Sequence, residues 1–357
     1  MPRKKTYAMV TGLGLIGMSP HTSHVASSIS FPPVGSMPLR IGLPRLDAFV
    51  GNIESGHLHL LYGSEKSGLS DRLLYHLLVE AIREPGTSAV HILCGNYRSK
   101  CDAPDVELLL CLAKRAGLEP RDSLDRIHIV CAFTEEQQTE IIDHIVELLA
   151  TNSRIGVVAV QQVGKLLSKP PLVSRERRDS LSDMIYRLVR LCAEVGVPIA
   201  ASASPSTYGR PIPAPDGGAY LTQLAEVAIY LRAMKGGGAT AYLLNHHEEA
   251  KIGGRLDLDE DELGRTRSTR TWEQARQPGN RYVALLRDNE TKAFFDALWE
   301  VWSSEQGVMT YGYALSALDL LKLARMDKTR PVETPRVMKQ DTQELLERLV
   351  ARVIAQG

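Results

Sequence analysis

A short stretch bracketed by glycines contains the residue types that bind phosphate in nucleotide-dependent proteins. Gly63, Gly68 and Ser70 follow the spacing of the phosphate-binding loop GxxxxGK[ST]. In such a loop the backbone N–H groups surround the phosphates, the lysine contacts the outer phosphates and the hydroxyl binds Mg²⁺. Leu69 stands at the position of that lysine, and Lys66 inside the loop is the nearest amine. The stretch therefore predicts a phosphate-binding loop without its usual cation.

The elements around this loop alternate between strand and helix patterns. The loop follows an apolar segment that ends at Tyr62 and precedes a helix predicted over residues 71–82. Further strands are predicted over 89–94, 126–132, 155–163, 198–202, 227–233 and 239–244, and further helices over 105–117, 135–150 and 181–195. The 155–163 segment is almost continuously apolar, which is typical of a strand buried on both faces of a parallel sheet. The alternation predicts an α/β fold with a doubly wound, mostly parallel sheet.

Composition divides the chain into four expected parts. They are a flexible lead-in rich in Ser, Pro and Gly over 1–37, the α/β core over 38–250, a charged linker or long loop over 251–281, and a helical C-terminal extension over 282–357. Within the third part apolar residues are scarce, which is why no strand is predicted there. The glycine-rich turn 235–238 predicts a hairpin between the last two strands of the core.

Bulk properties exclude several classes of protein. Lys+Arg and Asp+Glu both number 42, so net charge gives no general attraction to nucleic acid or to membranes. No apolar run reaches the roughly 18 residues that a membrane span needs, so no membrane partner is expected. The five cysteines form no CxxC pair, which favours free thiols in a reducing compartment over a disulfide framework. These properties predict an intracellular protein.

Six segments of the predicted core, in collinear order, resemble a known family. They are residues 43–47 (LPRLD), 53–56 (IESG), 193–199 (AEVGVPI), 216–221 (DGGAYL), 229–232 (IYLR) and 235–237 (KGG). Together they resemble the core of the RecA-like recombinases, particularly the archaeal and eukaryotic recombinases and their paralogues. The resemblance implies a RecA-like core that binds ATP at the phosphate loop and DNA through two further loops. It also implies a nuclear location in a eukaryote or a cytoplasmic one in an archaeon.

At the positions that this resemblance assigns to ATP chemistry, the functional groups are missing. Such an ATPase needs one carboxylate near the metal and a second carboxylate to activate water. Gln161 stands in the first of these positions and Gly95 in the second, and Ser204 replaces the family's nucleotide-sensing glutamine. These departures predict a protein without catalytic residues, metal or required cofactor, in which ATP binding is weak at most. The vestigial nucleotide site would comprise Gly63, Lys66, Gly68, Leu69, Ser70 and Gln161.

The resemblance also assigns two segments to DNA contact, residues 165–179 and 205–217. The first is basic, and cations on a surface loop suit contact with phosphates. The second contains one ring that could stack on a base. The expected DNA-binding residues are Lys165, Lys169, Arg175, Arg177, Arg178, Tyr208 and Arg210. A basic, solvated surface loop without DNA is the alternative.

The sequence therefore predicts a non-catalytic recombinase paralogue. Its expected role is to assist homologous recombination and DNA repair by binding a recombinase or another paralogue, together with single-stranded DNA. Two alternatives stay open. The first is a KaiC-like regulatory or scaffold protein that acts by protein contacts alone, and the second is an ATPase completed by residues of a partner subunit.

Overall fold

The computed structural model describes the core of the chain. The described residues are 39–63, 68–95, 105–132, 135–151, 154–166, 175–206, 211–235, 237–263 and residue 310. The expected lead-in over 1–37 and the expected C-terminal helices beyond residue 282 lie outside these ranges, apart from Thr310. Thr310 forms an isolated antiparallel bridge with His128.

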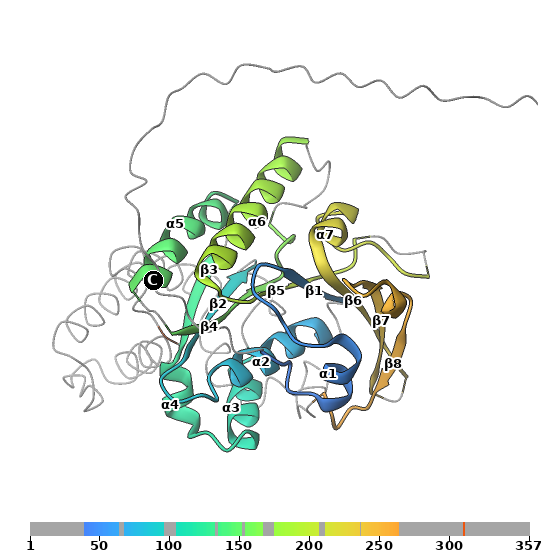
Figure 1. The fold of residues 1–357 in the computed structure, drawn as a ribbon, viewed down its shortest axis with the longest axis horizontal. Helices are drawn as coiled ribbons and strands as arrows, with labels where there is room; N and C mark the ends of the chain where they lie inside the picture. The colour runs from blue at the N-terminus through green and yellow to red at the C-terminus, as the bar shows by residue number, and fades with distance from the viewer. Residues whose placement is uncertain are drawn as a thin grey trace, which may run out of the picture. The chain divides into compact units, whose positions relative to one another are not determined.

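A single mostly parallel sheet organises the described core (Figure 1). Its eight strands stand in the order β3-β2-β4-β5-β1-β6-β7-β8. Their bounds are β1 Leu58–Gly63, β2 Ser88–Cys94, β3 Ile127–Ala132, β4 Ile155–Gln161, β5 Ile199–Ala203, β6 Ala225–Ala233, β7 Ala239–Asn245 and β8 Arg255–Leu258. Strands β1 to β6 pair in parallel, whereas β7 and β8 add two antiparallel strands at one edge.

Helices cover both faces of this sheet, as a doubly wound fold requires (Figure 1). Helices α2, α3 and α4 pack together on one face, and α5 packs with α6 on the other. The bounds are α1 Pro44–Val50, α2 Leu69–Ala81, α3 Val106–Arg115, α4 Pro120–Asp125, α5 Glu135–Thr151, α6 Arg175–Val195 and α7 Ala219–Leu224, with a short 3₁₀ turn at Glu249–Lys251. The α/β prediction is confirmed, and the architecture is that of a RecA-like core.

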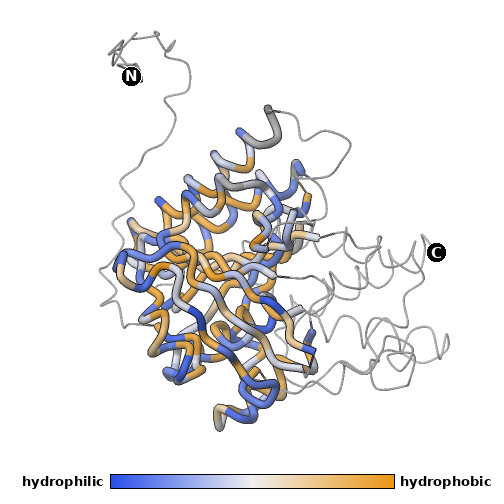
Figure 2. Tube along the Cα trace, turned by 90° about the vertical axis from the view of Figure 1, so that its right-hand side faces the viewer, coloured by the Kyte–Doolittle hydropathy of each residue, from blue (hydrophilic) through white to orange (hydrophobic). Residues whose placement is uncertain are grey.

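The hydrophobic pattern of the sequence explains this packing. All six residues of β1 are buried, because helices cover both faces of the central strands. On α2 the predicted apolar face is fully buried, and it consists of Leu73, Leu74, Leu77 and Leu78, with Ile82 just beyond the helix end. Figure 2 shows hydrophobic segments running through the middle of the described core and hydrophilic ones at outer turns.

Three parts of the core differ from the sequence prediction. Helix α6 begins at Arg175, six residues before the predicted start, because a charged first turn of Arg and Glu residues is compatible with a helix although it lacks an apolar stripe. Strand β8 lies inside the segment expected to be a linker, and it pairs with β7 through its backbone. The short helices α4 and α7 were not predicted, since each spans only six residues.

The order of the strands defines one edge where a site can form. From β1 the chain crosses through α2 to β2 on one side, whereas β5 connects through α7 to β6 on the other side of β1. Ligands of open α/β sheets bind outside the carboxyl ends of the strands at such a reversal. The carboxyl ends of β1, β4 and β5 are neighbours here, and the glycine-bracketed loop leaves from β1.

Within the described part of the chain, none of the helices has the length and apolar character of a membrane span.

Candidate functional site

The two bracketing glycines of the loop have structural reasons of their own. Gly63 ends β1, and a Cβ at this position would lie 2.6 Å from the carbonyl oxygen of Leu231 on β6. Gly68 caps α2 with φ of 58°, a left-handed conformation that glycine adopts without strain. The residues between them, including Lys66, lie outside the described ranges. The glycine spacing is thus required for strand packing and helix entry, whether or not phosphate binds.

The start of α2 contains no cation at the position of the loop lysine. Leu69 is the first residue of the helix, and its side chain is only 4% exposed because it packs into the core. The hydroxyl of Ser70, which the loop pattern assigns to Mg²⁺, is buried and has no hydrogen-bond partner among the described residues. A buried hydroxyl left unpaired destabilises a fold by about 1–3 kcal/mol. At the two positions that the loop pattern assigns to Mg²⁺ and to the lysine, the structure thus has a buried hydroxyl and an apolar side chain.

The residue after Ser70 is the centre of a buried polar network. Asp71 is 9% exposed, and its carboxylate accepts hydrogen bonds from side chains at the ends of two strands. The Nε2 of Gln161 donates to it at 3.3 Å, and the Nε2 of Gln162 donates to its two oxygens at 3.0 and 3.1 Å. The hydroxyl of Ser202 donates to the same carboxylate. A buried carboxylate needs such donors, because burial without them is strongly unfavourable.

Further hydrogen bonds connect Gln162 with two serines at the end of β5. Ser204 Oγ donates to Gln162 Oε1 at 2.8 Å, and the backbone N–H of Gln162 donates to Ser202 Oγ at 3.0 Å. We name Asp71, Gln161, Gln162, Ser202 and Ser204 the Asp71 cluster. Helix α2, strand β4 and strand β5 each contribute to it, so the cluster joins three elements at the carboxyl edge of the sheet.

Two buried rings, Tyr75 on α2 and His91 on β2, lie beside the cluster. Tyr75 donates its hydroxyl hydrogen to Gln161 Oε1 at 3.2 Å and accepts from the backbone N–H of Asp105 at 2.9 Å. Burial raises the pKa of Tyr75 well above its ordinary value of 10, so the phenol stays protonated. His91 contacts Tyr75 edge-to-face with ring centroids 5.6 Å apart, and burial lowers its pKa to about 4. Both rings are therefore neutral at pH 7.

Gln162 has an unusual backbone conformation. Its φ is 56°, and among the described non-glycine residues it alone has a positive φ. Such strain persists where the surrounding structure over-determines it, and it concentrates at functional sites. Here the side-chain amide bonds to Asp71 and Ser204, and these contacts hold the strained turn that leads from β4 toward Lys165.

These groups do not fit a metal–nucleotide complex poised for hydrolysis. Gln161, which the family resemblance assigns to the position of the metal-binding carboxylate, directs its amide to Asp71. Gly95, which the resemblance assigns to the position of the water-activating carboxylate, has no side chain. Asp71 supplies a carboxylate close by, but its oxygens already accept from three side chains of the cluster. The arrangement is suited to connecting protein segments.

The structure places the expected DNA-binding residues only in part. Lys165 lies half-buried in the turn after β4. Of the other cations in the first segment, Lys169 lies outside the described ranges. The three arginines belong to the first turn of α6, where only the backbone is described. The expectation that the arginines lie on a loop was therefore wrong, because the helix begins at Arg175. Tyr208 and Arg210 lie outside the described ranges.

Sequence reasoning missed most of the Asp71 cluster, although one signal was present. Asp71 occupies a position of the α2 apolar stripe, three, four and seven residues before Leu74, Tyr75 and Leu78. An acid on a stripe that faces the core must find hydrogen-bond donors there. Its partners come from strands about 90 and 131 residues away in sequence, and no local pattern identifies them.

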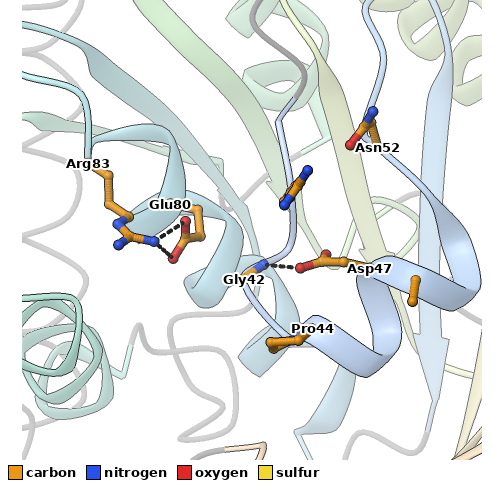
Figure 3. A pocket seen from close by; sticks show the side chains of 8 residues that line it. Gly42, Pro44, Asp47, Asn52, Glu80 and Arg83 are labelled. Carbon is orange, nitrogen blue, oxygen red and sulfur yellow. Dashed lines mark hydrogen bonds and ion pairs between the residues drawn. The ribbon is translucent and has the colours of Figure 1, made fainter.

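Two other polar groupings lie away from this edge. His246, His247 and Glu248 approach each other as metal ligands could, but both ring nitrogens of His246 are engaged, with the Val50 carbonyl and with the Glu248 N–H. A cavity of about 420 Å³ lies near the far end of α2 (Figure 3). Its two carboxylates are also engaged.

In that cavity Glu80 pairs with Arg83, and Asp47 accepts from the backbone N–H of Ile41 and of Gly42. Figure 3 shows Glu80 and Arg83 at the end of α2 and Asp47 and Pro44 on α1. The first contact lies at the end of α2, and the second joins α1 to the segment that precedes it, so the carboxyl edge of the sheet remains the candidate site.

Part of the core is similar in sequence to a known protein. Over 176 residues the chain is 25% identical to the DNA repair protein RAD51 of Saccharomyces cerevisiae. The matched region covers 46% of this chain and 41% of that protein, so the chain spans less than half of its length. No family model matches the chain. The fold and this similarity together indicate that the core is related to the RecA-like recombinases.

Proposed function

We propose that this protein acts in recombination or DNA repair as a RecA-like protein that does not hydrolyse ATP. It would act by binding a recombinase or a recombinase paralogue together with single-stranded DNA. The observation that carries the proposal is Gln161, whose amide takes the place of a metal-binding carboxylate and is directed to Asp71 inside the protein. The similarity to a DNA repair protein supports the biological setting.

The absence of turnover is tested with purified protein, ATP and Mg²⁺. We expect phosphate release at the buffer background, both for the wild type and for Leu69→Lys. The added lysine does not restore turnover, because the two carboxylates are still missing and Leu69 is packed in the core. Turnover by the wild-type protein alone would overturn the proposal. Turnover that arises only with an added recombinase would instead favour an ATPase completed by a partner subunit.

A second candidate is weak nucleotide binding without turnover, which the unpaired hydroxyl of Ser70 favours. Equilibrium dialysis of ATP with Mg²⁺ against the wild type and Ser70→Ala measures it. We expect weak binding that Ser70→Ala lowers further, and equal binding by the two proteins would count against this candidate.

DNA binding is tested by fluorescence anisotropy with a labelled oligothymidylate at several salt concentrations. Replacing Arg175, Arg177 and Arg178 by alanine should weaken binding and lower the slope of log K against log salt by about 2, because three phosphate contacts are lost. The matched control is the double variant Arg187→Ala/Arg190→Ala in the same helix, whose side chains pair with Asp143 and Glu194. Equal affinities for the triple variant and the wild type would contradict the assignment.

Partner binding distinguishes the remaining alternative. In a pull-down of a recombinase by this protein, binding that single-stranded DNA strengthens would support the proposal. Retention that DNA does not affect, from a protein without DNA affinity of its own, would favour a scaffold that acts by protein contacts alone.

A further inference from the structure

The Asp71 cluster joins the three elements that surround the candidate site. Asp71 belongs to the first turn of α2. Gln161 ends β4 and Gln162 follows it, whereas Ser202 lies in β5 and Ser204 directly after it. All five side chains belong to buried residues, none more than 9% exposed. Hydrogen bonds to a buried carboxylate are stronger than bonds between neutral groups. The cluster is therefore a strong connection between a helix and two strands that are otherwise separate in sequence.

Two segments of the chain begin at this cluster and are in contact from their first residues. Gln162 starts the segment that leads to α6, and Ser204 starts the segment that leads to α7. Their side chains are bonded to each other at 2.8 Å. The backbone continues the connection, since Val163 N–H donates to Ser202 O at 2.9 Å. Within the second segment, Asp216 N–H donates to Ser204 O at 2.5 Å and brings the returning part back to its start.

The contact between the two segments is close enough to exclude a side chain. A Cβ at Gly164 would lie 2.3 Å from the backbone oxygen of Asp216. Gly164 belongs to the first segment and Asp216 to the returning part of the second, so the backbones of the two segments are in close contact. We name residues 162–166 and 204–206 with 214–218 the paired roots.

We infer that the Asp71 cluster fixes the paired roots in one arrangement without a nucleotide. In a nucleotide-dependent protein a metal and phosphates at this edge would connect the same helix and strands. Here the hydrogen bonds of the Asp71 cluster already connect them among the described residues. DNA affinity would then be independent of ATP. The DNA part of this inference rests on the proposed function, whereas the fixed geometry of the roots does not.

Hydrogen–deuterium exchange of the paired roots tests the inference in the full-length protein. In the wild type, ATP with Mg²⁺ should leave exchange in both roots unchanged. Ser204→Ala removes the bond to Gln162 and should increase exchange in both roots together. Ser206→Ala is the matched control, because the Ser206 hydroxyl bonds only within its own segment, to Ala214 O at 3.2 Å. It should leave residues 162–166 unchanged.

A second variant pair keeps the test informative if one protein is unstable. Asp71→Ala should increase exchange in both roots by about tenfold or more, as expected when a local cooperative unit opens. Asp71→Asn retains one carbonyl acceptor and should restore part of the protection. Nucleotide-dependent protection of either root in the wild type, or a change confined to one root in both Ser204→Ala and Asp71→Ala, would overturn the inference.

The DNA measurement separates this inference from the proposed function. Wild-type affinity for oligothymidylate should be equal with and without ATP and Mg²⁺. Asp71→Ala should weaken it while the salt slope stays the same, because the phosphate contacts themselves are kept. A tenfold gain of affinity on adding ATP would contradict the inference. Failure of the wild type to bind DNA at all would contradict the proposed function, and the exchange result would still decide the geometry of the roots.

Discussion

Acidification should destabilise this protein progressively from about pH 6.5 downward, because buried histidines must stay neutral in the folded state. Burial lowers the pKa of His59, His76 and His91 from 6.5 to about 4. Between these pH values the unfolded chain binds protons that the folded chain does not, so the free energy of unfolding falls as pH falls. Above pH 6.5 both states are neutral and the contribution is fully present.

The expected size of this effect is large. Each histidine contributes about 1.4 kcal/mol per pH unit well inside the window, or roughly 3 kcal/mol over its whole width. Three such groups together approach the total stability of a typical domain, which is about 5–15 kcal/mol. The measurement is urea denaturation at pH values from 8 to 5, with intrinsic fluorescence as the readout of unfolding.

Variants identify the histidines as the cause. His91→Gln cannot titrate and should reduce the slope of stability against pH by about a third, whatever its effect on stability at pH 8. His247→Gln is the control, because His247 is exposed, and it should leave the slope unchanged. Burial raises the pKa of Asp47 and Asp105, which opposes the trend at the acid end, but the comparison between variants cancels this. Equal slopes for the wild type and His91→Gln would refute the explanation.

Exchanging an amide for a carboxylate in the Asp71 cluster should be strongly destabilising. Gln161→Glu has almost the same shape, but it places a second carboxylate where Gln161 Nε2 now lies 3.3 Å from Asp71. Two buried like charges cannot both ionise without a large penalty, so we expect a loss of about 3–5 kcal/mol at pH 8. Because the shared proton binds with a raised pKa, stability should partly return as pH falls toward 6.

A double-mutant cycle makes this prediction specific. Adding Asp71→Asn to Gln161→Glu restores one carboxylate and one amide, with their places exchanged, and should recover most of the stability. Gln223→Glu makes the same chemical change at an exposed position of α7 and should be nearly neutral. An additive cycle, with no interaction energy between positions 71 and 161, would show that the hydrogen bond does not act as described.

The sequence predicted burial correctly where the residue pattern of a single helix or strand reflects what covers it. The apolar stripe of α2 predicted its buried face residue by residue, and the apolar run of β4 predicted a strand covered on both faces. Such patterns are reliable because burial against a covered sheet is a local requirement on each residue. The same reasoning misplaced the start of α6, because its first turn lies outside the apolar stripe and is recognised only from backbone geometry.

The candidate site shows the opposite case. Sequence patterns predicted that catalytic groups are missing, since Leu69, Gln161 and Gly95 could be compared with the needs of an ATPase site, and this stays a prediction. They did not indicate which contacts the residues at this edge make. Asp71 was simply an acid in the first turn of a helix, and Ser202 and Gln162 were ordinary polar residues at strand ends. Their connection depends on the crossing order of the strands, which places β5 between β4 and β1.

By itself, the sequence determined the fold class and the glycine-bracketed loop, whereas the loss of the groups that hydrolyse ATP stays a prediction. These follow from residue types and spacing along one stretch of chain. Only the tertiary structure decided three further features. The carboxyl edge of the sheet contains the Asp71 cluster, Gln162 has a strained backbone, and the paired roots are in contact. The reason is physical: a buried carboxylate is stabilised by whichever donors the fold brings within about 3 Å, and here they come from strands that only the sheet places together.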